Sequence, residues 1–391
     1  MDKNYPLASP TWDEAELAAI RNVVSSGQFT MGERVAEFEA DFARYVGSRY
    51  CVMVNSGSSA NLLMAAALSY QEGSRVKRGD EVIVPAVSWS TTYFPFHQYG
   101  LKLKIVDVDS ETLNYDLDAL EEAITDRTRI VVAVNLLGNP NDFERIKKLV
   151  SSRDIILLED NCESLGGRFG SKMSGTFGLM GTFSTFFSHH ISTMEGGMVA
   201  TDDEELYHIL ICLRAHGWTR NLPKKNRVCG EKSDDPFYES FRFVLPGYNL
   251  RPTELNAAIG LEQLKKLPGF IRTRRENAEQ FKSVLGDHRH FQIQKEIGQS
   301  SWFGFSLVIK PGAPIGRAQV VRAMAEKGIE CRPIVAGNFA RSESCKWMDT
   351  EVFGELKNAD RVHEFGLFVG NHHYRLDAEI RLLADTLNGL S

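Results

Sequence analysis

Short apolar stretches alternate with helical patterns through the first half of this chain, and this alternation limits the folds open to it. Apolar runs of strand length recur at 50–54, 81–85, 103–108, 130–135 and 155–160. Stretches with apolar residues at helical spacing separate them, as at 60–68, 117–124 and 142–150. Such alternation is typical of a mainly parallel sheet with helices on both faces. We therefore expect an α/β fold.

The length predicts a second, smaller domain. Single cores stop growing at about 250–300 residues, and this chain has 391 residues. We expect a large domain over 1–260 and a small α+β domain over 261–391. A long helical stretch at 253–285 leads into the second part, where 302–309 alternates like a half-buried strand.

Composition and charge exclude several classes of function. A net charge of -6 with 25% charged residues gives no basic field for nucleic-acid binding. The six cysteines are scattered, with no C-x-x-C pair, which favours reduced thiols and predicts no metal site. The polar start, 1–12, does not resemble a signal peptide, and no apolar run approaches the roughly 20 residues that span a bilayer. We expect a cytoplasmic protein without membrane partners.

A turn of small residues connects the first apolar strand to an apolar helix. The turn reads Asn-Ser-Gly-Ser-Ser and includes Gly57 and Ser58. Free N–H groups at a helix N-terminus bind anions, and Gly57 lets the backbone approach a ligand closely. The plain alternative is an ordinary serine-rich helix cap.

Polar residues follow the apolar strands at the edge where ligands of such sheets bind. Asp160 ends the strand at 155–160, and Asn135 ends the preceding strand. Downstream lie Ser184, the pair His189-His190, and Glu195 followed by two glycines.

This order resembles the sugar aminotransferase family, which is also called DegT/DnrJ/EryC1/StrS and uses pyridoxal phosphate. In that family an aspartate at a strand end meets the pyridine nitrogen, and a lysine six residues before Glu-Gly-Gly binds the cofactor covalently. Here that lysine position holds His189. The resemblance covers nearly the whole chain and implies an aspartate aminotransferase-like fold of type I.

The resemblance also implies roles for the other residues of the cofactor site. Trp89 would stack on the pyridine ring, although a core tryptophan is the alternative. Glu163 would reach the hydroxyl side of the ring or a water, although a carboxylate at a helix start is nearly as common. Ser184, with Gly57 and Ser58, would hold the phosphate.

By the same resemblance, substrate and partner contacts come from loops. Phe29 lies in a loop that the family places against the sugar, and His216 and Arg220 belong to a basic loop suited to a nucleotide sugar. A solvated charge cluster is the alternative for that loop. Asn249 matches a loop that reaches the neighbouring subunit's cofactor phosphate, which implies a homodimer.

Histidine in place of the lysine points to the family's dehydratase branch. A histidine cannot hold the cofactor covalently, but it can move protons. The resemblance then implies noncovalent pyridoxal or pyridoxamine phosphate, L-glutamate as amino donor, and loss of the C3 hydroxyl of GDP-4-keto-6-deoxy-D-mannose. The implied product is GDP-4-keto-3,6-dideoxy-D-mannose, with release of ammonia and 2-oxoglutarate, in 3,6-dideoxysugar (O-antigen) biosynthesis.

Two rival interpretations stay open. A nucleotide-sugar 4-aminotransferase would need another lysine in reach, such as Lys172, although the motif does not place that lysine at the cofactor. A cofactor-binding regulator without catalysis would be expected to lose the acid-base residue or to gain a DNA-binding extension, and Asp160, Ser184 and Glu195 are all present.

Overall fold

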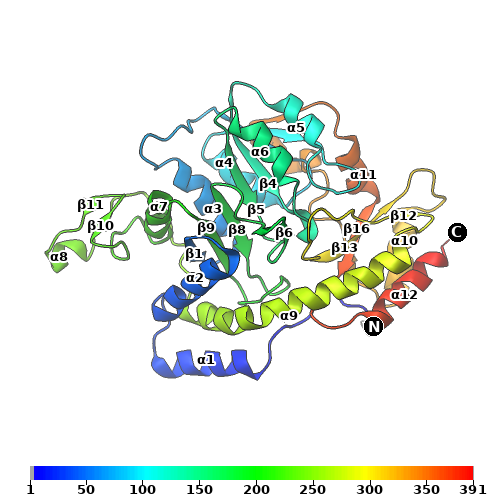
Figure 1. Cartoon of the computed structure of the whole chain (residues 1–391), viewed down its shortest axis with the longest axis horizontal. Helices are drawn as coiled ribbons and strands as arrows, with labels where there is room; N and C mark the ends of the chain where they lie inside the picture. The colour runs from blue at the N-terminus through cyan, green and yellow to red at the C-terminus, as the bar shows by residue number, and fades with distance from the viewer. Residues whose placement is uncertain (1–3, 391) are drawn as a thin grey trace.

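An eight-stranded sheet forms the centre of the computed structural model, which describes residues 4–390 (Figure 1). In spatial order its strands are β1 (Tyr50–Val54), β9 (Gly197–Thr201), β8 (Met180–Ser184), β5 (Ile156–Asp160), β4 (Thr128–Val134), β2 (Glu81–Pro85), β3 (Lys102–Val106) and β15 (Thr350–Val352). Strand β9 is antiparallel to both neighbours, and the other pairs are parallel. The parallel strands therefore end at one edge, which is where ligands of such sheets bind.

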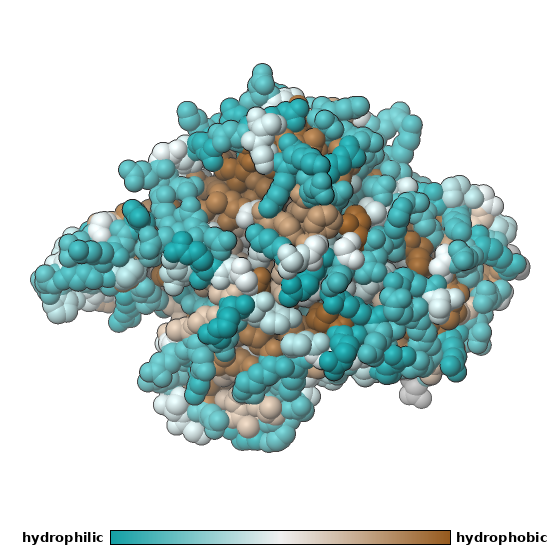
Figure 2. Space-filling model, viewed as in Figure 1, coloured by the Kyte–Doolittle hydropathy of each residue, from teal (hydrophilic) through white to brown (hydrophobic). Residues whose placement is uncertain are grey.

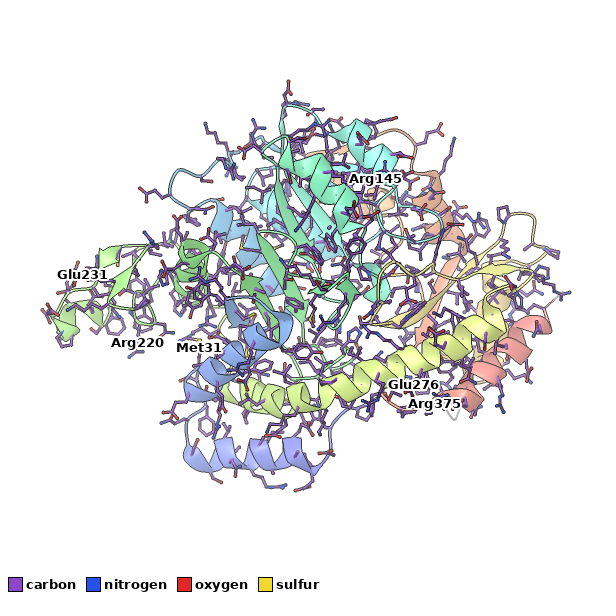
Figure 3. All side chains as sticks on the ribbon, viewed as in Figure 1. Met31, Arg145, Arg220, Glu231, Glu276 and Arg375 are labelled. Carbon is purple, nitrogen blue, oxygen red and sulfur yellow. The ribbon has the colours of Figure 1, made fainter. Side chains whose placement is uncertain are left out.

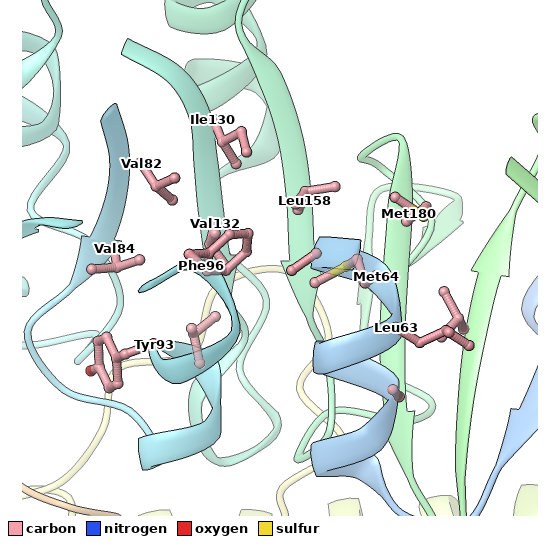
Figure 4. Packing of buried hydrophobic residues seen from close by; sticks show 14 of the residues in the cluster. Leu63, Met64, Val82, Val84, Tyr93, Phe96, Ile130, Val132, Leu158 and Met180 are labelled. Atoms are coloured by element: carbon pink, nitrogen blue, oxygen red, sulfur yellow. The ribbon is translucent and has the colours of Figure 1, made fainter. Parts of the chain in front are cut away.

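Helices cover both faces of this sheet. They are α2 (Glu33–Val46), α3 (Gly57–Leu68), α4 (Phe94–Gln98), α5 (Leu117–Ala123), α6 (Phe143–Ser151) and α7 (Glu204–Arg214). Alternate residues of β2 enter different cores: Val82 and Val84 pack with α3 and α4 (Figure 4), whereas Ile83 packs with α5 and α6. Burial of both faces explains why the strands read as continuous apolar runs.

The chain beyond residue 285 forms a second, antiparallel sheet of four short strands. They are β12 (Phe291–Gln292), β13 (Gly304–Ile309), β16 (Gly366–Gly370) and β14 (Cys331–Arg332), accompanied by α10 (Arg317–Glu326), α11 (Lys357–Phe365) and α12 (Asp377–Asn388). The sequence predicted a half-buried strand at 302–309, and the predicted burial is wrong. Strand β13 is buried throughout, because Phe305 and Leu307 enter the small core while Val308 packs against the main one.

One helix, α9 (Glu254–Leu285), runs beneath both sheets and joins them (Figure 1). Helices α1 (Glu14–Ser26) and α2 pack against it. The predicted boundary at residue 260 falls inside α9, and β15, from beyond that boundary, pairs with β3. The division at 260 stays a prediction, and its terminal residues 1–3 and 391 lie outside the described residues.

An arm extends from the main body beside α7, at the left of Figure 1. It contains β10 (Lys225–Asn226), β11 (Gly230–Glu231) and α8 (Pro236–Glu239), and a smaller hairpin of β6 (Arg168–Phe169) and β7 (Lys172–Met173) lies near the middle of the molecule. Four aromatic side chains of the arm are exposed, namely Phe237, Tyr238, Phe241 and Phe243. Figure 2 shows the visible face of the arm as mainly hydrophilic.

Two further features concern membrane-spanning helices and the state of the cysteines. Across residues 4–390 no helix combines the length and apolar character needed to cross a bilayer. All six cysteines are free thiols.

Candidate functional site

Asp160 ends β5 as a buried carboxylate with a complete set of donors. Its Oδ2 accepts hydrogen bonds from Asn61 Nδ2 at 2.8 Å and from Thr92 Oγ1 at 2.7 Å. Its Oδ1 accepts from the N–H of Cys162 at 3.2 Å. These donors fix the direction of the carboxylate at the strand edge, as a charged partner for a ring nitrogen requires.

Gly57 and Ser184 form a tight cradle at the start of α3. A Cβ at position 57 would lie 2.6 Å from Cβ of Ser184 and 3.1 Å from Sγ of Cys162, so only glycine fits. Ser56 caps the helix, because its Oγ accepts from the N–H of Ser59 at 3.0 Å. The first N–H groups of a helix have no partner inside the helix. The cradle therefore suits a phosphate group.

Ser58 and Trp89 lie on the open side of this cradle. Ser58 is exposed, and its Oγ is 2.9 Å from Oγ1 of Thr91 in the short η1 helix (Ser90–Thr92) that follows Trp89. Trp89 is 58% exposed, so it is not a core residue. A free aromatic face is available there for a flat ring.

Glu163 follows Asp160 by three residues, just beyond the end of β5. Its Oε2 accepts a hydrogen bond from the N–H of Leu137 at 3.0 Å, in the η2 turn (Leu136–Gly138). Burial raises the pKa of Glu163 from its ordinary 4.5 to about 7, and the charge of Asp160 adds to the rise, while the bond from Leu137 opposes it. Glu163 can thus act as a donor or an acceptor near neutral pH.

The two histidines after β8 have different surroundings. His190 is buried, and its Nε2 lies 3.2 Å from the carbonyl oxygen of Ser301. His189 is half-buried, and its Nδ1 is buried without a partner in the part of the chain that the structure describes. Burial lowers the pKa of His189 from 6.5 to about 4, and the charge of Arg274 adds to this, so the imidazole is neutral at pH 7. An orphaned, neutral ring nitrogen is what a general base needs.

The loops predicted to bind substrate meet at a small cavity, the second hollow, whose lining does not include the cradle residues Gly57 and Ser184. A cavity of about 70 Å³ is lined by Thr30, Met31, Ala215, Trp218, Arg220, Asn221 and Arg251. Met31 and Arg220, labelled in Figure 3, come from elements far apart in sequence. Phe29, next to this hollow in sequence, is 51% exposed, and His216 adopts a left-handed backbone with φ +63°. The Arg220 guanidinium lies 4.6 Å from the ring centre of Trp218.

Asn249 lies at the surface and does not contact the cradle of its own chain. Its Oδ1 accepts from Nε of Arg251 at 3.0 Å, and its backbone bridges to Ala215. The carbonyl of the next residue, Leu250, accepts from the N–H of Asn55 at 3.0 Å, so the loop is anchored beside the start of α3.

Sequence reasoning missed two residues that orient Asp160, namely Asn61 and Thr92. Asn61 is a buried amide in a helix that is otherwise apolar over 60–68, and that contrast was a usable signal. Arg251 was also missed as a lining residue of the second hollow. Lys172, the rival lysine, is exposed on β7, 5.5 Å from the ring of Phe177. Among the described residues, no cluster of three or more His, Cys, Asp or Glu side chains has the arrangement to hold a metal ion.

The site residues fit a phosphorylated pyridine cofactor. A cradle suited to phosphate lies at Gly57 and Ser184, an oriented carboxylate lies at Asp160, and the neutral His189 lies where the resemblance predicts a lysine. The DegT/DnrJ/EryC1/StrS aminotransferase family matches residues 10–386, and the chain belongs to that family. The predictions of the family and of its α/β fold are therefore confirmed.

The chain is 60% identical over 385 residues to the GDP-4-keto-6-deoxy-D-mannose 3-dehydratase of Yersinia pseudotuberculosis, covering 98% of each chain. It resembles a crystal structure of GDP-4-keto-6-deoxymannose-3-dehydratase in which a histidine is replaced by asparagine and GDP-perosamine is bound (TM-score 0.97, 59% identity, 98% and 100% coverage). It is similar, with the same TM-score, identity and coverage, to a structure of that dehydratase with a trapped PLP-glutamate geminal diamine.

Proposed function

We propose that this chain removes the C3 hydroxyl of GDP-4-keto-6-deoxy-D-mannose, with noncovalent pyridoxal or pyridoxamine phosphate and L-glutamate as amino donor. The observation that carries the proposal is His189, a neutral histidine at the position where the aminotransferases of the family have their lysine. The relative at 60% identity is a dehydratase for this sugar, and one solved relative was altered at a histidine. Both facts support a histidine-based reaction.

When bound, the cofactor supplies a protonated ring that accepts an electron pair from a neighbouring carbon. Asp160 keeps the ring nitrogen protonated, and its three donors hold the carboxylate in place for this task. Gly57, Ser58 and Ser184 hold the phosphate at the start of α3. Trp89 would stack its exposed face on the ring, and Glu163 would reach the hydroxyl side of the ring or a water.

His189 carries the proton that the reaction transfers to the leaving C3 oxygen of the sugar. Because burial holds its pKa near 4, the ring is neutral at pH 7 and accepts a proton at its imidazole nitrogen. For the same reason the imidazolium is a strong acid once it forms. It therefore returns the proton to the C3 oxygen of the sugar, which leaves as water rather than as hydroxide. One side chain thus serves both steps.

The second hollow forms one part of the site for the nucleotide diphosphate of the substrate, because its volume of about 70 Å³ holds only a small group. Arg220 and Arg251 supply positive charge there for a diphosphate, and Trp218 supplies an aromatic surface beside them. Phe29 and His216 are next in sequence to the lining residues Thr30 and Ala215, and they would contact the sugar. We place the reaction in the cytoplasm, in agreement with the free cysteines.

We also infer that the chain forms a homodimer. Asn249 is exposed, and the resemblance to the family implies that it contacts the cofactor phosphate of a second subunit. The arm exposes Phe237 to 89% and Phe241 to 72%, which favours burial against another chain. A two-fold arrangement would supply each site with Asn249 of the neighbouring subunit.

The substitution His189→Lys tests the role of His189. A lysine amine at this position would capture the cofactor, so borohydride reduction should leave the cofactor on the variant chain by mass spectrometry but not on the parent chain. We expect dehydration to fall by at least about 100-fold, because the variant lacks the proton carrier. Unchanged dehydration in the variant would refute the assignment.

A further inference from the structure

The ring of His189 is oriented without a hydrogen bond. Its Nδ1 has no partner among residues 4–390, and the only bond near the ring is the backbone one, from the His189 N–H to the Phe186 carbonyl at 2.9 Å. A catalytic histidine usually owes its orientation to a carboxylate or carbonyl on its second nitrogen. Another interaction must orient this ring.

Two phenyl rings pack against it. The ring centre of Phe303 lies 5.0 Å from that of His189 at an interplanar angle of 63°, and the ring of Phe186 lies 6.0 Å away at 80°. Edge-on aromatic pairs at these separations are favourable. Phe186 lies three residues before His189 in the same turn, so it moves with that turn. Phe303 comes from a distant part of the chain.

The backbone of Phe303 is fixed to the main body on both sides. Its N–H donates to the carbonyl of Leu137 at 3.0 Å, and its carbonyl accepts from Nη1 of the buried Arg274 at 3.1 Å. Gly138, with φ +95°, permits this approach, since a Cβ there would lie 2.8 Å from the Phe303 nitrogen. Leu137 in turn donates to Glu163. Two hydrogen bonds through the backbone of Leu137 thus connect Glu163 to Phe303, whose ring packs beside His189.

We propose that Phe303 is a positioning residue that sets the orientation of the His189 ring for proton transfer. The inference rests on the proposed function of His189. Orientation by packing leaves both ring nitrogens free of protein hydrogen bonds, so one nitrogen can accept a proton and return it without breaking a bond to the protein. Phe303 lies immediately before β13, and it therefore also ties this geometry to the small sheet.

Phe303→Leu keeps an apolar side chain but removes the ring. We expect kcat to fall about 10- to 100-fold, with KM for the GDP-sugar within about twofold, because misorientation of a reacting group affects the chemical step rather than binding. Phe303→Tyr, which keeps the ring, should recover most of kcat. Phe305→Leu is the matched control: Phe305 stacks on Phe281 in the small core and does not contact His189. It should lower Tm yet leave kcat within about twofold of the parent.

A second readout does not need the reaction. In cofactor-free protein with labelled histidine, the imidazole NMR signals of His189, assigned with His189→Asn, should shift and broaden in Phe303→Leu. They should return toward their parent positions in Phe303→Tyr and stay unchanged in Phe305→Leu. Parent-like signals and kcat in Phe303→Leu, or equal losses in Phe305→Leu, would overturn the proposal. Full dehydration by His189→Asn would instead refute the proposed function, and the NMR comparison would still stand.

Discussion

At the scale of single residues, two carboxyl groups a few residues apart have different hydrogen-bond partners. Asp160 accepts three hydrogen bonds, two of them from the side chains of Asn61 and Thr92. Glu163 accepts one, from Leu137, and is buried beside the charge of Asp160. Hydrogen bonds to a charged carboxylate favour ionisation, and burial opposes it. Burial therefore raises the pKa of Glu163 and suits this group to carry a proton near neutral pH.

The raised pKa of Glu163 predicts a pH dependence of stability. Between its ordinary 4.5 and about 7, the folded state holds a proton that the unfolded state has lost. The free energy of unfolding should therefore fall as pH rises through this window, by at most about 1.4 kcal/mol per pH unit from this group. Glu163→Gln should remove that contribution. Urea unfolding of both proteins at pH 5 to 8 measures it, and an identical slope in the two proteins would contradict the assigned pKa.

The sequence predicted the titratable residues Asp160 and His189 but not the two polar residues that orient Asp160. Asp160 and His189 could be predicted because each occupies a position fixed by a motif. Asn61 and Thr92 act through contacts across 99 and 68 positions of sequence, which no local pattern encodes. The lowered pKa of His189 also depends on Arg274, which lies on the distant helix α9.

At the scale of secondary structure elements, the start of α3 packs closely against the end of β8. Gly57 is the first residue of α3, and Ser184 is the last residue of β8. The sequence predicted α3 and an anion site at its start, because the small-residue turn is local, but it did not predict β8 as a strand. It did not predict the burial of β13, since the covering layers come from α9 and from the main sheet.

Gly57→Ala tests this contact. The added methyl group would lie 2.6 Å from Cβ of Ser184, so α3 or β8 must move. We expect about 1–3 kcal/mol of destabilisation and at least about tenfold weaker cofactor binding, measured by thermal unfolding and by absorbance titration.

The control is Gly269→Ala in α9. A Cβ there meets only a distal atom of Arg272 at 3.9 Å, so the change should stabilise the protein by about 0.5–1 kcal/mol through helix propensity. Parent-like cofactor affinity in Gly57→Ala would show that the cradle tolerates a side chain and does not approach the phosphate.

At the scale of the whole molecule, the cradle, Asp160 and His189 come from a single chain, whereas the loop of Asn249 and the arm are exposed at its surface. The cradle, the carboxylate and the histidine lie at the edge of the large sheet, whereas Asn249 and the arm lie at the surface. The resemblance to the family implied this arrangement, and the sequence by itself contains no pattern for a contact between subunits. The homodimer stays a prediction that mixing experiments can test.

Mixing two impaired variants distinguishes a contact between subunits from one within a chain. His189→Asn removes the proton carrier, and Asn249→Ala removes a phosphate contact. In a mixed dimer, one site would keep His189 of its own chain and Asn249 of the other. Random exchange should then restore about one quarter of the parent activity, because half of the dimers carry one complete site. Activity no higher than the average of the two variants would place Asn249 in its own site or outside the site.

The central claim is that this chain dehydrates a nucleotide sugar and does not aminate it. The most direct measurement incubates the protein with pyridoxal phosphate, glutamate and GDP-4-keto-6-deoxy-D-mannose, and follows 2-oxoglutarate, ammonia and sugar mass together. We predict that 2-oxoglutarate and ammonia rise in equal amounts while the sugar becomes the 3-deoxy ketone. A sugar that gains an amine, with 2-oxoglutarate formed but no free ammonia, would contradict this and identify the protein as an aminotransferase.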